Sequence, residues 1–354
     1  MTTILTTTGI SLFLRAKTEY KTESPTDDQM RQLLRMKPEI VSAEANSLLQ
    51  MAQKDDFLVF LHTETPDAIT CARLLEEFFR NRGFKHVELV QLEFQDDEKH
   101  IETRGLRNLV NRLIDEVEKA RRRGQDVIIN ATSGFKPEIG YSTVIGMLYQ
   151  VPIKYMHERF RRLVTFKPIA LDWDTSLFLN YQKFFDWLDE ELRQQKEVEQ
   201  RLRALPDKES IAELLDSPDA DGYILLSPLG HVLRRQFQGE IEEAILAEWP
   251  PSAGIEDIDE KLTSSLLKSK HHPVKNLLSV CYKIAALDCV QEIQGGFFEN
   301  TTRSHLKRYN PDGTILLLWA DGSHGTRLTV FTTAKGRPQT LKVANKIREI
   351  LEID

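Results

Sequence analysis

The sequence predicts an α/β protein with an N-terminal parallel sheet, a helical connector with a winged-helix-like segment, and a C-terminal α+β part. Up to about residue 170, short apolar segments alternate with segments of crossover-helix length, which favours parallel strands covered on both faces. From 176 to about 206 the pattern is helical and highly charged. The tail carries strand-like segments between hairpin-type turns. We therefore expect three parts, at 1–172, 173–262 and 263–354.

The N-terminal elements follow in strand and helix order. The first strand includes Ile4 and Leu5 and breaks at Gly9. Further strands are expected at 57–62, 86–92, 126–130 and 152–156. Helices are expected from about 66 to 82, 106 to 123 and 137 to 149, and the first two stop at Gly83 and Gly124.

The middle and the tail differ in their patterns. Ser227 and Pro228 predict a helix N-cap with proline in the first turn, within the winged-helix-like segment 221–233. In the tail we expect helices at about 261–270 and 274–294, strands at 303–308, 314–320 and 326–333, and a closing helix at about 339–352.

Charge is distributed unevenly along the 354 residues. The chain has 47 basic and 54 acidic residues and a formal net charge of −7, which excludes a uniformly basic nucleic-acid coat. Residues 264–354 hold 13 Lys and Arg against 8 Asp and Glu, a net +5, which leaves −12 for the other 263 residues. The composition thus permits a local basic site in the tail.

Cysteine content and hydropathy indicate the compartment. Three cysteines fit neither a disulfide framework nor a zinc motif, so we expect thiols in a reducing cytosol and no metal site. No apolar run approaches the length of a membrane span, and the N-terminus lacks the features of a secretory signal. We therefore expect a cytoplasmic protein without membrane contact.

Two loops of the N-terminal part point to a phosphate-bearing ligand. TTTGIS at 6–11 follows the first strand, and NATSGFK at 130–136 lies between a strand and a helix. Ligands of open α/β sheets bind outside the carboxyl ends of the strands, where small residues and a helix N-terminus favour an anion. Thr63 would lie at the same edge. On the residues alone, ordinary strand-to-helix turns account for both loops equally well.

The two loops resemble those of the CARF family, the CRISPR-associated Rossmann-fold proteins, over about residues 1–170. The resemblance implies a Rossmann-like domain in a homodimer that binds one cyclic oligoadenylate, with cyclic tetra-adenylate as the expected ring and no other cofactor. It implies ligand contacts from these residues: Thr8, Gly9, Ser11, Asn130, Thr132, Ser133, Gly134, Phe135 and Lys136. Ile10 departs from the family, which often has a threonine there.

The tail concentrates basic residues on its predicted strands and the loop after them. Because residues two apart on a strand share a face, Arg303, His305 and Lys307 are expected on one face and Arg308 on the other. Arginine and lysine stabilise a phosphorane, and histidine transfers protons, so this set suits RNA cleavage through the 2′-OH. A solvated basic sheet face without chemistry is the plainer reading.

The tail, over about 265–354, resembles the RelE-type mRNA interferases, which cleave mRNA in the ribosome without metal. The resemblance implies catalysis by basic side chains: Arg303, His305, Lys307, Arg308, Arg327, Lys335 and Arg337. The C-terminal tyrosine of many relatives is absent, and Tyr309 or His305 is its expected substitute. The implied function is a cyclic-oligoadenylate-activated ribonuclease with ribosome and mRNA as partners.

Three alternatives stay open at this point. The winged-helix-like segment would also suit a ligand-responsive transcription regulator, although its expected recognition helix is poorly basic. A ring nuclease that degrades only its messenger would fit the N-terminal loops. An HEPN ribonuclease fits less well, because Arg303 and His305 lack the spacing of that family. The connector has no assigned chemistry, and recruitment of a ribosomal protein is one role open to it.

Overall fold

The computed structural model describes residues 1–93, 105–133, 136–157, 162–169, 173–264, 266 and 274–353. Gly134 and Phe135 of the predicted ligand loop lie outside these residues, and of Lys136 only the backbone is described. The chain forms two compact units. Unit 1 consists of Met1–Asp172 and Leu192–Val232, and unit 2 consists of Trp173–Glu191 and Leu233–Asp354. The predicted connector contributes residues to both.

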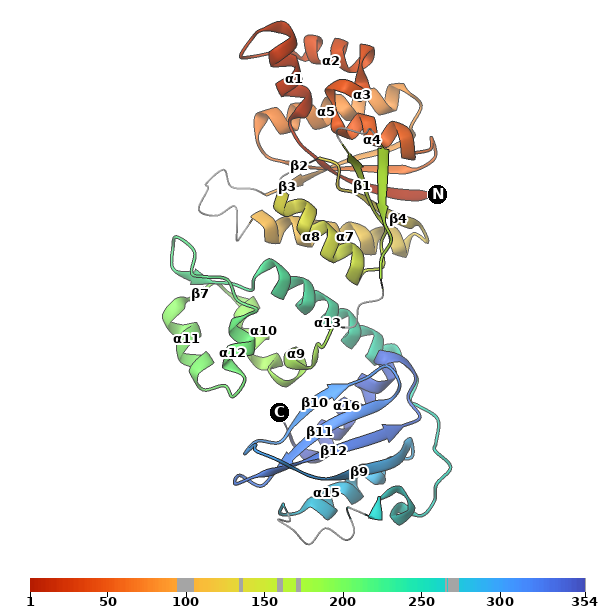
Figure 1. The fold of residues 1–354 in the computed structure, drawn as a ribbon, viewed down its shortest axis with the longest axis vertical. Helices are drawn as coiled ribbons and strands as arrows, with labels where there is room; N and C mark the ends of the chain where they lie inside the picture. The colour runs from red at the N-terminus through yellow and green to blue at the C-terminus, as the bar shows by residue number, and fades with distance from the viewer. Residues whose placement is uncertain are drawn as a thin grey trace. The chain divides into compact units, whose positions relative to one another are not determined.

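The described part of unit 1 is built on a sheet with the strand order β3-β2-β1-β4-β5-β6 (Figure 1). Neighbours from β3 to β5 pair in parallel, and β6 runs antiparallel to β5. The bounds are β1 Thr2–Thr8, β2 Phe57–Thr63, β3 His86–Leu92, β4 Asp126–Asn130, β5 Ile153–His157 and β6 Arg162–Phe166. The sheet confirms the α/β class and the five predicted strands, whereas β6 was not predicted.

Helices cover both faces of this sheet, because successive strand residues point to opposite faces and are apolar on both. Ile4, Leu58 and Phe60 pack under the helices that precede β2 and β3, and Leu5 and Val59 pack under those that follow β3. The first set comprises α1 Ser11–Tyr20, α2 Asp27–Met36, α3 Pro38–Val41, α4 Ala43–Met51 and α5 Pro66–Asn81. The second comprises α7 Leu106–Arg122 and α8 Lys136–Leu148. Helices α1 to α4 were not predicted from the sequence.

The rest of unit 1 contains short helices and a two-stranded ribbon, and the winged-helix-like assignment of 221–233 stays a prediction. The elements are β7 Arg193–Gln194, α11 Gln195–Arg203, α12 Lys208–Ala212, β8 Tyr223–Ile224 and the start of α13, Pro228–Leu246. The Gly230 amide donates to Ser227 Oγ at 3.0 Å, which confirms the predicted cap. A Cβ at Gly230 would lie 2.3 Å from the Leu214 carbonyl oxygen, so the close approach requires glycine.

Unit 2 is built on an antiparallel sheet with the strand order β10-β11-β12-β9 in its described part. Its strands are β9 Val290–Glu299, β10 His305–Tyr309, β11 Thr314–Ala320 and β12 Gly325–Thr332. Its helices are α9 Ser176–Asn180, α10 Gln182–Glu190, the 3-10 helix η2 Ile258–Lys261, α15 Leu277–Ala285 and α16 Gly336–Leu351. The helix predicted for 274–294 is wrong after residue 285, where the chain turns and enters β9.

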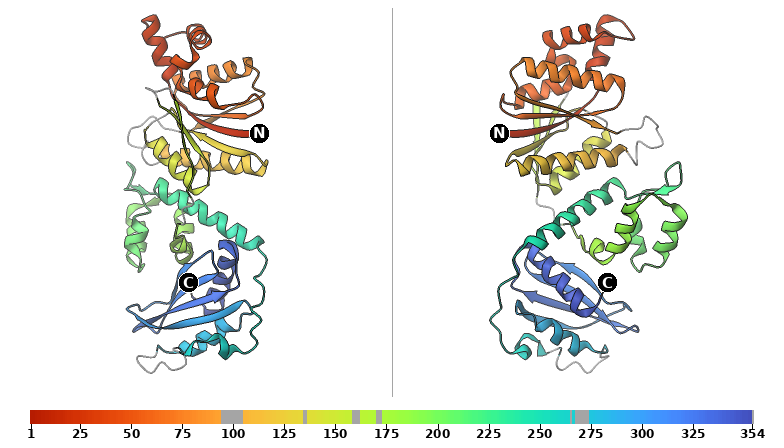
Figure 2. Two further views of the ribbon diagram at one scale, coloured as in Figure 1. Left: turned by 45° about the vertical axis from the view of Figure 1, so that its right-hand side comes forward. Right: turned by 180° about the vertical axis from the view of Figure 1, so that it is seen from behind.

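The core of unit 2 lies between the sheet and α15 and α16. Leu306, Leu317 and Leu328 face each other across adjacent strands and are fully buried. Cys281 and Ile347 belong to the same buried layer, one on each helix. In the view from behind in Figure 2, α16 lies across the core face of the sheet. Figure 1 therefore shows the opposite face of the sheet, which we call the outer face. None of the helices in the described ranges is long and apolar enough to cross a membrane.

Candidate functional sites

The strand order of unit 1 has a switch point beside β1, where this class of fold predicts a ligand crevice. From β1 the chain proceeds to β2 and β3 on one side and then crosses to β4 and β5 on the other. Connections that leave neighbouring strands in opposite directions open a space at their carboxyl ends, where open α/β sheets bind ligands. Both predicted loops begin there, after Thr8 of β1 and Asn130 of β4, and Thr63 ends the adjacent β2. The tertiary structure thus brings the two loops together.

The loops are joined by reciprocal hydrogen bonds. Thr7 Oγ1 donates to the Ser133 carbonyl oxygen, and Ser133 Oγ donates to the Thr7 carbonyl oxygen. Both residues are at least nine-tenths buried. The hydroxyl of Ser133, a predicted ligand contact, is therefore hydrogen-bonded to the other loop and ties the two loops together.

Asn130 and Thr132 likewise use their side chains inside the protein. The Asn130 amide donates to Ser47 Oγ at 2.9 Å and to Thr6 Oγ1 at 3.3 Å. Thr132 Oγ1 donates to Asn130 Oδ1 at 2.6 Å and accepts from the Met156 amide at 3.0 Å. These bonds hold the loop after β4 against α4 and β5. The N-terminus of α8, which follows this loop, is a group that suits an anion.

Glu44 is a site residue that the sequence analysis did not find. It lies in the first turn of α4, is 1% exposed, and accepts from the Gly9 amide at 2.8 Å and from Ser11 Oγ at 3.3 Å. Ser42 Oγ donates to the same carboxylate at 2.6 Å. Two predicted ligand contacts, Gly9 and Ser11, are thus bonded to an internal anion. The signal was present as a polar segment, SAEANS at 42–47, that forms a buried helix turn.

Thr8 is the predicted contact with unused hydrogen-bonding capacity. Its side chain is 6% exposed, and within the described ranges Oγ1 has no hydrogen-bond partner. A buried hydroxyl without a partner costs free energy, about 1–3 kcal/mol in typical proteins. Its position next to Gly9, at the end of β1, places this unsatisfied group at the crevice. A polar ligand atom there would satisfy it.

The register of unit 2 gathers three predicted catalytic residues on the outer face. His305 and Arg327 are both partners of Leu318, and Arg308 is the partner of Leu316, two residues along the same strand. Directly paired residues share a face of a sheet, as do residues two apart on one strand. His305, Arg308 and Arg327 therefore lie on one face, within two neighbouring rows of side chains.

This arrangement corrects the predicted faces of β10. We expected His305 and Lys307 on one face and Arg308 on the other. The register shifts between Leu306 and Arg308, because Lys307 forms a β-bulge that has no partner in β11. A bulge adds one residue to a strand and reverses the alternation beyond it. Arg308 thus lies on the same face as His305, and Lys307 does not take part in the alternation of faces.

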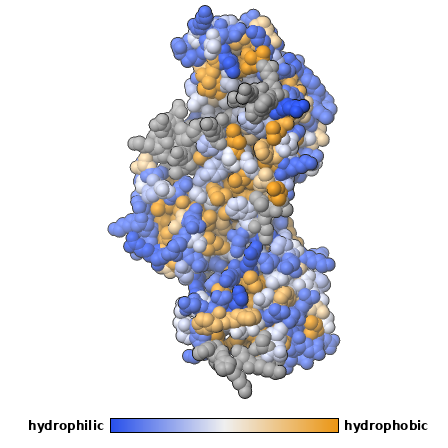
Figure 3. All heavy atoms as spheres, in the orientation of Figure 1, coloured by the Kyte–Doolittle hydropathy of each residue, from blue (hydrophilic) through white to orange (hydrophobic). Residues whose placement is uncertain are grey.

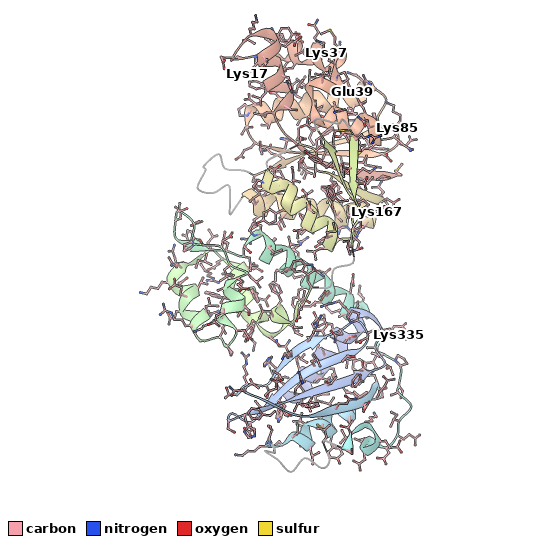
Figure 4. The ribbon with its side chains drawn as sticks, in the orientation of Figure 1. Lys17, Lys37, Glu39, Lys85, Lys167 and Lys335 are labelled. Carbon is pink, nitrogen blue, oxygen red and sulfur yellow. The ribbon has the colours of Figure 1, made fainter. Side chains whose placement is uncertain are left out.

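The other predicted basic residues lie elsewhere. Arg303 precedes β10, where its guanidinium lies 5.3 Å from the Tyr181 ring centre. Lys335 is exposed at the N-cap of α16 (Figure 4). Arg337 is mostly buried, its Nε 3.2 Å from Glu240 Oε1 and a terminal nitrogen 3.1 Å from Thr175 Oγ1. Arg337 is thereby committed to a structural ion pair.

Tyr309 belongs to the same buried cluster. It is the partner of Ile315 on the core face, and its hydroxyl donates to Glu240 Oε2 at 2.8 Å and lies 2.7 Å from Thr175 Oγ1. Burial, followed by the nearby Glu240 charge, raises the pKa of Tyr309 well above its usual range. The side chain therefore cannot serve as an acid on the outer face. His305 remains there as the proton-transferring residue type.

Comparison with known families gives one match. Residues 39–169 match the model of a family described as CRISPR-associated protein Cas_APE2256. The matched segment includes the loop after β4 and α4 with Glu44, and it begins after the loop that follows β1. The match covers less than half of the chain. It confirms the predicted likeness to a CRISPR-associated family in the region that builds the crevice.

Three solved structures are similar at low sequence identity. Protein VC1899 from Vibrio cholerae is 10% identical, with 94% of this chain and 77% of that chain covered and a TM-score of 0.29. Csm6 from Enterococcus italicus, bound to cyclic hexa-2′-fluoro-hexa-dAMP, is 12% identical over 81% of this chain and 60% of that chain, with a TM-score of 0.33. Can2 from Sulfobacillus thermosulfidooxidans, in complex with cyclic tetra-adenylate, is 11% identical over 91% and 77%, with a TM-score of 0.27.

Proposed function

We propose that this protein is a homodimeric ribonuclease that a cyclic oligoadenylate activates and that cleaves messenger RNA on the ribosome in CRISPR antiviral defence. The observation that carries the catalytic part is the gathering of His305, Arg308 and Arg327 on the outer face of unit 2. The crevice of unit 1, together with the match of residues 39–169 to a CRISPR-associated family, supports the binding of a cyclic oligoadenylate, which we call the messenger.

The residue types on the outer face suit cleavage by the RNA's own 2′-OH. In this reaction the 2′-oxygen bonds to phosphorus, the bond from phosphorus to the 5′-oxygen breaks, and a proton moves from the first oxygen to the second. Arg308 and Arg327 would stabilise the added charge of the phosphorane, and His305 would transfer a proton. None of these roles needs a metal ion, since guanidinium groups are permanently charged.

The groups at the crevice suit a ligand that carries phosphate and ribose oxygens. Backbone amides near Ser133 and the N-terminus of α8 favour phosphate, and the buried Thr8 hydroxyl can bond to a ribose or phosphate oxygen. Lys136 at the start of α8 adds a positive charge in the sequence. Activation requires that the messenger bind the active arrangement more tightly than the resting one.

In vitro translation with and without cyclic tetra-adenylate tests the proposal, with primer extension as the readout of mRNA cleavage. We expect cleavage that depends on the messenger and on ribosomes. Lys136→Ala should no longer be activated by cyclic tetra-adenylate. Arg327→Ala should no longer cleave mRNA but should still bind cyclic tetra-adenylate. Equal cleavage of naked RNA would overturn the ribosome-dependent part. Equal mRNA cleavage with and without cyclic tetra-adenylate would overturn the proposal that unit 1 is a sensor.

A further inference from the structure

A row of four side chains crosses the outer face of unit 2. Phe297 of β9 is the partner of Arg327, Arg327 is the partner of Leu318, and Leu318 is the partner of His305. Directly paired residues share a face, so an aromatic ring, a guanidinium, an aliphatic chain and an imidazole lie in sequence across the sheet. With neighbouring strands about 4.8 Å apart, the row spans roughly 14 Å.

Phe297 is held in this row by a glycine pair. The register between β9 and β12 shifts so that Leu328 pairs with Gly295 and Arg327 pairs with Phe297, which leaves Gly296 as the extra residue of a bulge. Gly296 has φ 96°, a conformation that residues with a Cβ rarely adopt. A Cβ at Gly295 would lie 2.4 Å from Leu328 Cδ2. The backbone is therefore shaped to present the ring beside Arg327.

The ring is unusually exposed for a phenylalanine. Phe297 is 60% exposed, and the Arg327 guanidinium lies 5.6 Å from its ring centre. Glu299 Oε1 lies 3.7 Å from Arg327 Nη1 and restrains that guanidinium from the same strand as Phe297. Figure 3 shows hydrophobic and hydrophilic residues mixed over this face of unit 2. An exposed aromatic face next to a cation is the chemistry that single-stranded nucleic acids recognise.

We propose that Phe297 is a stacking platform for an unpaired nucleobase of RNA, with Arg327 contacting the adjacent phosphate. This inference deepens the proposed function, because it names single-stranded RNA as the ligand of the outer face. Charge favours this occupant over a second copy of an acidic chain, since Arg308 and Arg327 lie on the face and the tail carries a net +5. A base inside a duplex exposes only its edges, so paired RNA would not stack there.

The adjacent Phe298 provides a matched control. It has the same side chain, is 65% exposed, and pairs with Thr326, which shares the core face with Leu328. Its ring stacks on His324 at 6.1 Å between centres. Substitution of Phe298 therefore removes the same apolar area from the opposite face and leaves the row through Phe297 intact.

Binding of a short single-stranded RNA, methylated at every 2′-oxygen so that it cannot be cleaved, tests the proposal by fluorescence anisotropy. The full chain is used, with and without cyclic tetra-adenylate. We expect Phe297→Ala to weaken binding at least about 10-fold, Phe297→Trp to restore it, and Phe298→Ala to stay within about 2-fold of wild type. Circular dichroism and thermal melting verify that each variant is folded.

The outcomes separate this inference from the proposed function. Wild-type affinity of Phe297→Ala would overturn the stacking role and leave ribosomal cleavage standing. If Phe297→Ala loses RNA binding but the wild type cleaves no mRNA in the translation assay, the stacking role stands and the ribonuclease activity is rejected. If wild type binds no RNA, or if Phe297→Ala alters only self-association in sedimentation, the outer face is not an RNA surface.

Discussion

The Gly9 amide donates its hydrogen bond to the Glu44 carboxylate at 2.8 Å, at the edge of the sheet where a phosphate is expected. The carboxylate also accepts from the Ser11 and Ser42 hydroxyls and is 1% exposed. A buried negative charge at this place opposes an approaching polyanion, because charges interact more strongly where water is excluded. Glu44 thus places a buried carboxylate directly against the loop after β1, beside the proposed ligand site.

Glu44→Gln removes this charge and keeps the shape of the side chain. We expect the variant to bind cyclic tetra-adenylate more tightly, by about 10-fold, which corresponds to about 1.4 kcal/mol. Isothermal titration calorimetry checks the affinity. Glu39→Gln, on exposed α3, is the control for a general charge effect and should change little (Figure 4). Weaker binding of cyclic tetra-adenylate by Glu44→Gln would contradict this and show that the carboxylate favours ligand binding.

The bulge at Lys307 predicts that substitution of two neighbouring basic residues changes the cleavage rate to different extents. Arg308→Ala should lower the rate of mRNA cleavage by roughly 10²-fold or more, since it removes a cation from the face with His305 and Arg327. Lys307→Ala should retain most activity, because the bulge takes its side chain out of that row. Single-turnover cleavage with messenger present measures both. A larger loss in Lys307→Ala than in Arg308→Ala would contradict the assigned faces.

Arg337→Ala should destabilise unit 2 rather than affect chemistry directly. The substitution leaves Glu240, 8% exposed, without the guanidinium 3.2 Å away, and breaking a buried pair costs about 3–5 kcal/mol. Urea unfolding followed by circular dichroism measures this loss. Lys335→Ala, exposed two residues earlier, should stay within about 0.5 kcal/mol of wild type. An unchanged unfolding midpoint for Arg337→Ala would show that the pair is not stabilising.

Tyr309 links the stability of unit 2 to alkaline pH. Burial raises its pKa in the folded protein above the ordinary value of about 10, so the unfolded chain releases this proton first. The stabilisation is complete below about pH 10 and is lost as the pH rises toward the raised pKa. Tyr309→Phe should cost about 1 kcal/mol at neutral pH, where two hydroxyl contacts disappear, and less at about pH 11.

Urea midpoints of wild type and Tyr309→Phe at both pH values check this prediction. Only the difference between the two proteins counts, because burial also raises the pKa of Tyr141. A difference that grows with pH would reverse the sign and reject the argument. Messenger-dependent cleavage by Tyr309→Phe should persist, since the hydroxyl faces the core and not the outer face.

Local patterns were sufficient for most of unit 1. Buried strands such as Phe57–Thr63 are continuous apolar runs, and Gly83 and Gly124 adopt positive φ where their helices end. The segment after Ala285 shows the opposite case. Buried Val290 and Ile293 lie three residues apart, a spacing typical of a helix face, because a register shift makes Gln291 an extra residue opposite β12. Pairing with β12 nevertheless makes this segment a strand.

Residues close together in the chain are enough to predict the class of unit 1, the two loops after β1 and β4, and the basic character of the tail. Which groups meet depends on the tertiary structure. It put Glu44 against Gly9 across 35 positions, turned Arg308 toward His305 through a one-residue bulge, and brought Phe297 beside Arg327. Register and bulges depend on partner strands, and a shift of one residue reverses the face of every side chain beyond it.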